Sequence, residues 1–94
     1  MDAKTLKASP AAPEGESAPL TALWHAGKGE WDKAHALIQD EVSKEAAWVH
    51  AHLHRVEGDG ENAAYWYGKA GKPTTDAPLD QEWHEIAHAL ILMR

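Results

Sequence analysis

The chain has 94 residues, which allows one domain with a small hydrophobic core. Its formal net charge of −6 with neutral histidines argues against binding to nucleic acid or to anionic membranes, because those partners call for a basic surface. The absence of cysteine excludes disulfides and thiolate metal sites. No apolar run approaches the roughly 18 residues of a membrane span. From these two features we expect a cytoplasmic protein.

The N-terminal residues 1–16 are rich in Ala, Pro, Lys, Glu and Ser and contain a single leucine, Leu6. Because such a segment buries little apolar surface, we expect a disordered tail followed by one helical domain over residues 17–94. The first helix of that domain is predicted over residues 18–26. Ser17 is suited to cap its start, and Gly27 is suited to end it.

Two further helices are predicted before the next glycine turn. The second covers residues 30–42, and its apolar stripe consists of Trp31, Ala34, Leu37, Ile38 and Val42. The third begins after Ser43, a suitable N-cap, and continues to Glu57. Its apolar stripe consists of Ala46, Val49, Leu53 and Val56 at the spacing of one helix face.

The last two predicted helices lie on either side of a Pro- and Thr-rich loop. The fourth follows Asp59 and Gly60 and ends near Gly71, with Ala63, Trp66, Tyr67 and Ala70 on one face. The fifth covers residues 80–93 and buries Trp83, Ile86, Ala87 and Leu90. Its end, Ile91, Leu92 and Met93, is apolar on nearly every side. We expect this end either to be clamped between helices or to contact another chain, for example in a homodimer formed through this helix.

The turns before the second and fourth helices share a pattern. Gly29-Glu30 is followed by Ala34, and Gly58-Asp59 by Ala63, each alanine five residues after its glycine. With Tyr67 and Ala70, this pattern resembles the tetratricopeptide repeat, in which a glycine–acid turn joins two helices that cross closely at a small residue. The resemblance implies an all-α fold of five helices, built as two antiparallel hairpins plus a C-terminal helix.

The segment from Trp48 to Tyr67 also resembles an uncharacterised family of small bacterial proteins. It carries the runs Trp48-Val49-His50-Ala51-His52-Leu53-His54-Arg55 and Ala64-Tyr65-Trp66-Tyr67. The tetratricopeptide resemblance implies a non-enzymatic module that binds a protein or peptide in a groove lined by the first helix of each pair. The candidate binding residues are Trp48, His52, Arg55 and Tyr65. For Trp48 and Tyr65 the alternative is a packing role within the domain.

Histidine is unusually abundant, with seven in the chain, and four of the seven form two pairs at i, i+4 spacing, His50 with His54 and His84 with His88. His84 and His88 lie one helical turn apart in a His-Glu-x-x-His pattern, in which two imidazoles bind zinc and Glu85 would activate a water molecule. The alternative function is therefore a histidine-ligated metal-binding protein, of which a zinc hydrolase is the most specific form. A catalytic zinc needs a third protein ligand, which would come from His50, His54 or Glu57.

Overall fold

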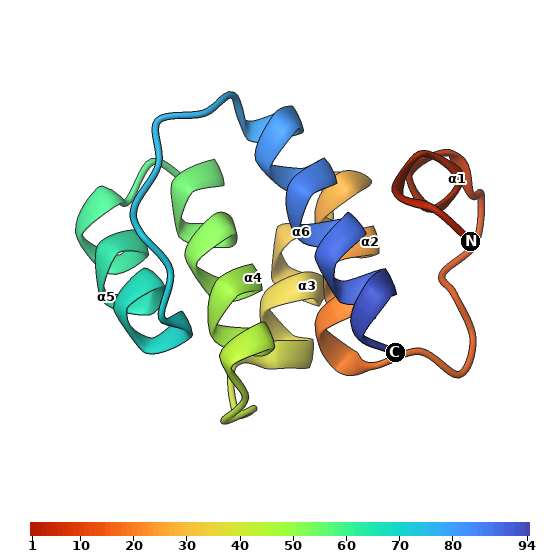
Figure 1. The fold of residues 1–94 in the computed structure, drawn as a ribbon, viewed down its shortest axis with the longest axis horizontal. Helices are drawn as coiled ribbons and strands as arrows, with labels where there is room; N and C mark the ends of the chain where they lie inside the picture. The colour runs from red at the N-terminus through yellow and green to blue at the C-terminus, as the bar shows by residue number, and fades with distance from the viewer.

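The computed structural model describes all 94 residues and consists of α-helices joined by turns and loops, with no β-strand (Figure 1). The helices are α1 (Ala3–Ala8), α2 (Ala18–Gly27), α3 (Trp31–Ile38), α4 (Lys44–Val56), α5 (Gly60–Ala70) and α6 (Leu79–Met93). The all-α class is confirmed, but the predicted number of five helices is wrong, because there are six. None of the six has the length and hydropathy needed to cross a membrane.

The additional helix, α1, lies in the segment that was expected to be a disordered tail. Asp2 caps it by accepting a 2.8 Å hydrogen bond from the Thr5 backbone N–H. Leu6 is fully buried in the core, and the Lys7 ammonium lies 4.4 Å from the ring centroid of Trp83 on α6. A six-residue helix is not stable alone in water, so these contacts with the rest of the chain hold α1 in place.

The two glycine–acid turns have the backbone geometry that their sequence indicates. Gly29 and Gly58 have positive φ angles of 77° and 84°, a region that glycine enters without steric cost. Ala34 and Ala63, five residues after these glycines, are 0% and 3% exposed. The predicted burial of both alanines is confirmed, and α2 packs against α3 while α4 packs against α5.

Helix α3 is shorter than the predicted 30–42 segment and ends at Ile38. Ser43 has an extended backbone and caps α4 by accepting a hydrogen bond from the Ala46 N–H, so a helix cannot continue through it. Val42 consequently lies in the loop and is fully exposed, not part of an apolar stripe. Val56, at the end of α4, is also exposed rather than buried.

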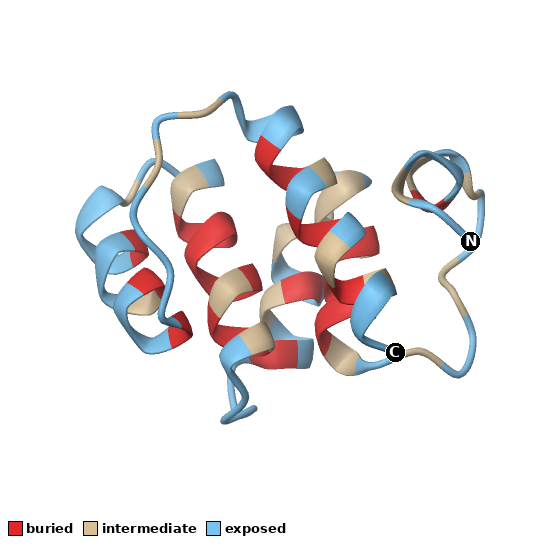
Figure 2. Ribbon diagram, in the orientation of Figure 1, coloured by how far each residue is buried: buried red, intermediate tan, exposed pale blue.

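Helix α6 packs across α2 and α4, the first helices of the two pairs, and also touches α1 (Figure 1). The Trp83 indole N–H donates a 2.7 Å hydrogen bond to the Leu23 carbonyl oxygen of α2. Ile86, Ala87 and Leu90 of α6 are buried as well, and Figure 2 shows buried segments along this helix. The face on which the tetratricopeptide resemblance places a binding groove is thus covered by the chain's own α6.

Candidate functional site

Two of the four predicted binding residues, His52 and Arg55, belong to a buried network centred on Glu82 of α6. The Glu82 carboxylate is 2% exposed and accepts hydrogen bonds from His52 Nδ1 at 2.7 Å and from Arg55 Nη1 at 2.8 Å. It also accepts a hydrogen bond from the Tyr67 hydroxyl of α5. Arg55 donates a further bond to the Ala77 carbonyl oxygen. His52 and Arg55 therefore bind the chain's own C-terminal helix and the loop before it.

The protonation of this network follows from its contacts. Burial raises the pKa of Glu82, but hydrogen bonds from His52, Tyr67 and Arg55 outweigh burial and hold that pKa below its usual value. Burial and the bond to Glu82 raise the pKa of the Tyr67 hydroxyl well above its usual value, so Tyr67 keeps its proton. No buried side-chain nitrogen or oxygen lacks a partner. The network is thus a satisfied structural link between α4, α5 and α6.

The third predicted binding residue, Trp48, is half-buried on α4 and lines a hollow of about 550 Å³. Leu92 and Met93 line the same hollow from the end of α6 and are 71% and 61% exposed. The sequence predicts a binding role for Trp48 and a contact with another chain for the end of the last helix. The residues of both predictions line this one hollow. We call the hollow lined by Trp48, Leu92, Met93, Ala70, Ala89, Gly71, Lys44, Lys72 and Glu45 the Trp48 groove.

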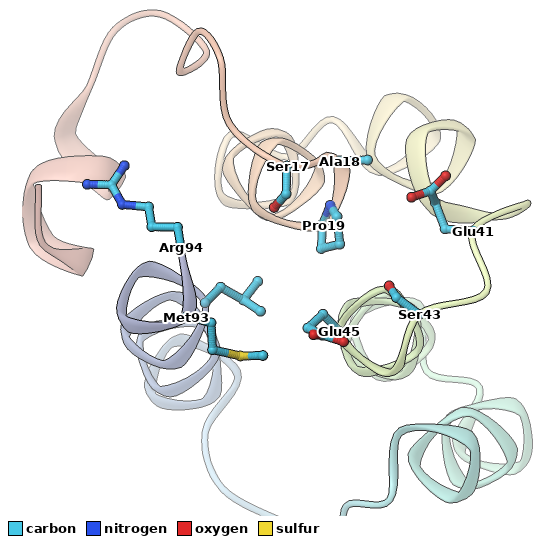
Figure 3. Close-up of a pocket in the computed structure, with 9 residues that line it drawn as sticks. Ser17, Ala18, Pro19, Glu41, Ser43, Glu45, Met93 and Arg94 are labelled. Carbon is cyan, nitrogen blue, oxygen red and sulfur yellow. The ribbon is translucent and has the colours of Figure 1, made fainter.

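A second hollow of about 470 Å³ adjoins the Trp48 groove and shares Glu45 and Met93 with it. Figure 3 shows Met93 and Glu45 on one side of this hollow, with Ser17 and Pro19 of the α2 start opposite them. The Met93 side chain lines both hollows. This provides an extended surface at the C-terminal end of α6.

The fourth predicted binding residue, Tyr65, lies away from the Trp48 groove. It points outward from α5 and is 55% exposed. It lines a different, smaller hollow of about 300 Å³, together with Val42 and Trp66. The structure therefore does not bring Tyr65 together with Trp48, His52 or Arg55.

The His84–Glu85–His88 motif lies on α6, as its spacing predicts, without a third ligand. His84 Nδ1 lies 2.9 Å from the Asp80 carbonyl oxygen, and His88 is exposed. The chain has two groups of at least three His, Asp or Glu side chains with ligand atoms within 4.8 Å of one another, and neither group contains His84 or His88. The predicted sources of a third zinc ligand belong to these two other groups: His50, His54 and Glu57.

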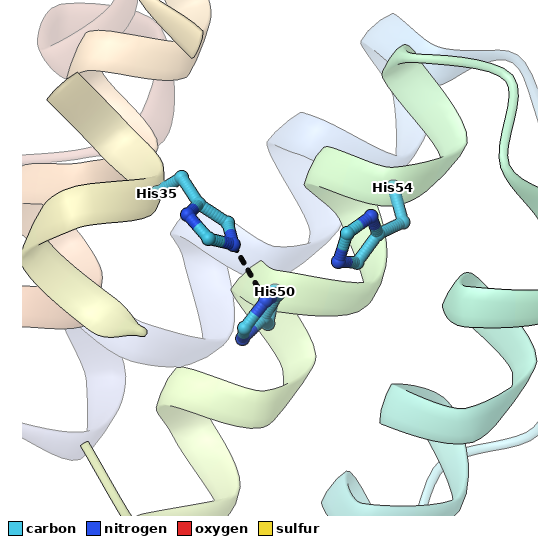
Figure 4. A group of neighbouring side chains, drawn as sticks. All are labelled: His35, His50 and His54. Atoms are coloured by element: carbon cyan, nitrogen blue, oxygen red, sulfur yellow. Dashed lines mark hydrogen bonds between the residues drawn. The ribbon is translucent and has the colours of Figure 1, made fainter. Parts of the chain in front are cut away.

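One of these groups joins His50 and His54 of α4 to His35 of α3 (Figure 4). The spacing of His50 and His54 identified them as a pair on one helix face, but His35 was missed. His35 lies in a separate helix, and its approach depends on how α3 crosses α4. The i, i+4 spacing of Trp31 and His35 is the local signal for His35. In the structure the His35 ring stacks on Trp31.

We expect His50 to make the folded protein less stable in mild acid. Burial, with smaller contributions from His35 and His54, lowers the pKa of His50 from 6.5 to about 4. The unfolded chain therefore binds a proton at His50 between these values and the folded chain does not, so folding stability falls as the pH falls through this window. We expect the loss between pH 7.5 and pH 5 to be about 2 kcal/mol.

Urea unfolding at these two pH values, on the native chain and on a His50→Gln variant, measures this term. The native chain should lose about 2 kcal/mol more than the variant over the same interval. Equal losses in the two proteins would contradict a depressed His50 pKa.

Comparisons of this chain with protein-family models, with curated proteins and with solved structures find no match. The resemblance to tetratricopeptide repeats, and to a family of small bacterial proteins, thus stays a prediction.

Proposed function

We propose that this protein is a non-enzymatic interaction module that binds a peptide segment of another protein in the Trp48 groove. The observation that carries the proposal is the meeting of half-buried Trp48 with exposed Leu92 and Met93 at one hollow. In the same proposal, α2/α3 and α4/α5 are two antiparallel, tetratricopeptide-like hairpins and α6 is the added helix of a bacterial cytoplasmic protein. The peptide then docks beside α6, since α6 covers the face of α2 and α4.

The apolar side chains of the groove favour binding of an apolar partner. Complete burial of a Leu or Met side chain contributes roughly 1.5–3 kcal/mol, and Leu92 and Met93 are still mostly exposed. A flexible thioether such as that of Met93 adapts to partners of different shape. Tryptophan is among the residues that most often dominate binding energy at interfaces, which makes Trp48 the expected anchor.

The charges beside the groove favour an acidic partner. Lys44 and Lys72 both line it, and the Lys72 ammonium lies 4.3 Å from the ring centroid of Trp48. Glu45 is the only acidic side chain in the lining. We therefore propose that the occupant is a segment of a different protein that combines apolar and acidic residues.

Selection from a displayed peptide library tests this proposal. Peptides enriched on the native protein should carry Leu, Ile or Phe next to Asp or Glu, and should bind a Leu92→Ser variant at least about tenfold more weakly. Val42→Ser is the matched control, because Val42 is equally apolar, fully exposed and outside the groove. Failure to enrich any such peptide, or equal binding to the Leu92→Ser and Val42→Ser variants, would contradict the proposal.

Light scattering, carried out before the selection, tests whether a second copy of the chain occupies the Trp48 groove. The native protein should have the mass of a monomer at concentrations up to those used in the selection. A dimer that dissociates in the Leu92→Ser variant, but not in the Val42→Ser variant, would assign the groove to a second copy of the chain and contradict a peptide partner.

A further inference from the structure

We propose that His35, His50 and His54 form a binding site for one transition-metal ion that prefers imidazole ligands, such as zinc. The site lies between α3 and α4 and shares no residue with the Trp48 groove, so it goes beyond the function proposed above. It also differs from the His84–Glu85–His88 motif, which lies on α6.

The three imidazoles already lie close to a ligand arrangement. His35 Nε2 and His50 Nε2 are 3.0 Å apart, and one ligand nitrogen from each of the three rings lies within 4.8 Å of the others. Figure 4 shows the His35 ring of α3 pointing toward His50, with His54 one turn further along α4. Ligand nitrogens around a tetrahedral zinc at about 2.0–2.1 Å are roughly 3.3 Å apart. Binding of one ion requires the His35–His50 hydrogen bond to open and the stacked His50 and His54 rings to rotate until all three nitrogens point to the same ion.

The surrounding side chains hold the rings in this arrangement. The His35 ring stacks on Trp31 with centroids 4.8 Å apart, and the His50 ring stacks on Trp66 with centroids 3.8 Å apart. The Trp31 indole N–H donates a 2.7 Å hydrogen bond to the Leu53 carbonyl oxygen, which fixes α3 against α4. A site whose ligands are ordered before the ion arrives loses less entropy on binding.

His54 has the outer hydrogen bond that metal-binding histidines commonly make. Its Nδ1 lies 2.5 Å from a carboxylate oxygen of Glu57, which leaves Nε2 as the nitrogen able to bind a metal ion. A carboxylate behind a ligating imidazole fixes its tautomer and increases its basicity. Glu57 is thus a positioning residue for His54 in this proposal.

The ligand types determine which ions fit. A site made only of imidazole nitrogens suits zinc, copper or nickel, whereas magnesium and calcium prefer oxygen ligands. His50 and His54 are 4% and 8% exposed, so an ion bound to them is largely shielded from water. Three protein ligands leave a fourth position on a tetrahedral ion for water or another small ligand.

Calorimetric titration of the untagged, chelator-treated protein with Zn²⁺ tests the proposal. The native chain should bind one equivalent, and a His35→Gln variant should bind at least about 100-fold more weakly, because loss of an outer partner alone costs about 10–100-fold. A His84→Gln/His88→Gln double variant is the matched control, since it removes a histidine pair of the same spacing from α6 and should bind as the native chain does. A Glu57→Gln variant should fall between the two.

Substitution of Co²⁺ for Zn²⁺ supplies a second readout that reports geometry. The native chain and the His84→Gln/His88→Gln variant should both show the visible absorption of tetrahedral Co²⁺, and the His35→Gln variant should not. Circular dichroism shows whether each variant is folded. If the His35→Gln variant is not folded, the His54→Gln variant is used in its place. Absence of stoichiometric binding to the native chain, or binding that persists in the folded His35→Gln and His54→Gln variants, would overturn the proposal.

Discussion

Replacement of Glu82 by alanine is expected to lower the free energy of unfolding by about 3–5 kcal/mol, a typical cost of removing one partner from a buried charge network. The substitution leaves the Arg55 guanidinium, the Tyr67 hydroxyl and His52 without their common acceptor in a buried environment. A domain of this size has a total stability of roughly 5–15 kcal/mol, so the loss is a large part of the total. Urea unfolding followed by tryptophan fluorescence measures it.

The matched control for this prediction is Glu85→Ala on the same helix. Glu85 is exposed, and its carboxylate makes a hydrogen bond only to the Gln81 side chain. Its removal should change the free energy of unfolding by no more than about 0.5 kcal/mol. Equal effects of the two substitutions would show that the Glu82 network contributes little to the docking of α6.

Replacement of Trp83 by alanine should also cost about 3–5 kcal/mol, as is usual for a buried tryptophan. The Trp83 side chain is 2% exposed and joins α6 to α2 through the 2.7 Å hydrogen bond to Leu23. The Lys7 ammonium also lies against its ring, so the substitution should release α1 as well. Thermal unfolding and proteolysis of the first ten residues measure the two effects.

Two control variants separate the contributions at this position. Trp83→Phe keeps most of the ring but leaves the Leu23 carbonyl without its donor, which should cost about 1–3 kcal/mol. Leu92→Ala, on the exposed side of the same helix, should cost less than about 0.5 kcal/mol. A Trp83→Ala variant as stable as Leu92→Ala would contradict the burial of Trp83 between α6 and α2.

The sequence predicts the five helices of residues 17–94, apart from the end of α3, because their caps and most of their apolar stripes are local signals. Ser17, Ser43 and Asp59 each accept a hydrogen bond from a backbone N–H at the start of α2, α4 and α5, as their residue types suggest. Helix α1 was missed because its stability comes from burial of Leu6 against distant residues, which composition alone does not reveal.

The candidate sites were predictable only where one helix supplies the signal. His50 and His54 were recognised as a pair from their spacing, whereas His35 joins them through the crossing of α3 and α4. His52 and Arg55 were predicted to line a groove for a partner, and in the structure they bind Glu82 of the chain's own α6. The apolar stripe of α6 indicates which of its own faces is buried. It does not indicate which surface of the other helices that face covers.

The packing of α6 across α2 and α4 closes one face of the helix pairs and leaves the Trp48 groove open. A Cβ atom at Gly27 would lie 3.1 Å from Trp83 Nε1, so the Gly27 backbone lies directly against the indole. NMR spectra should therefore show cross-peaks between the Trp83 ring and the Gly27 α protons, with strong protection of the Trp83 indole N–H from exchange. Absence of these cross-peaks, with rapid exchange of the indole N–H, would contradict this packing.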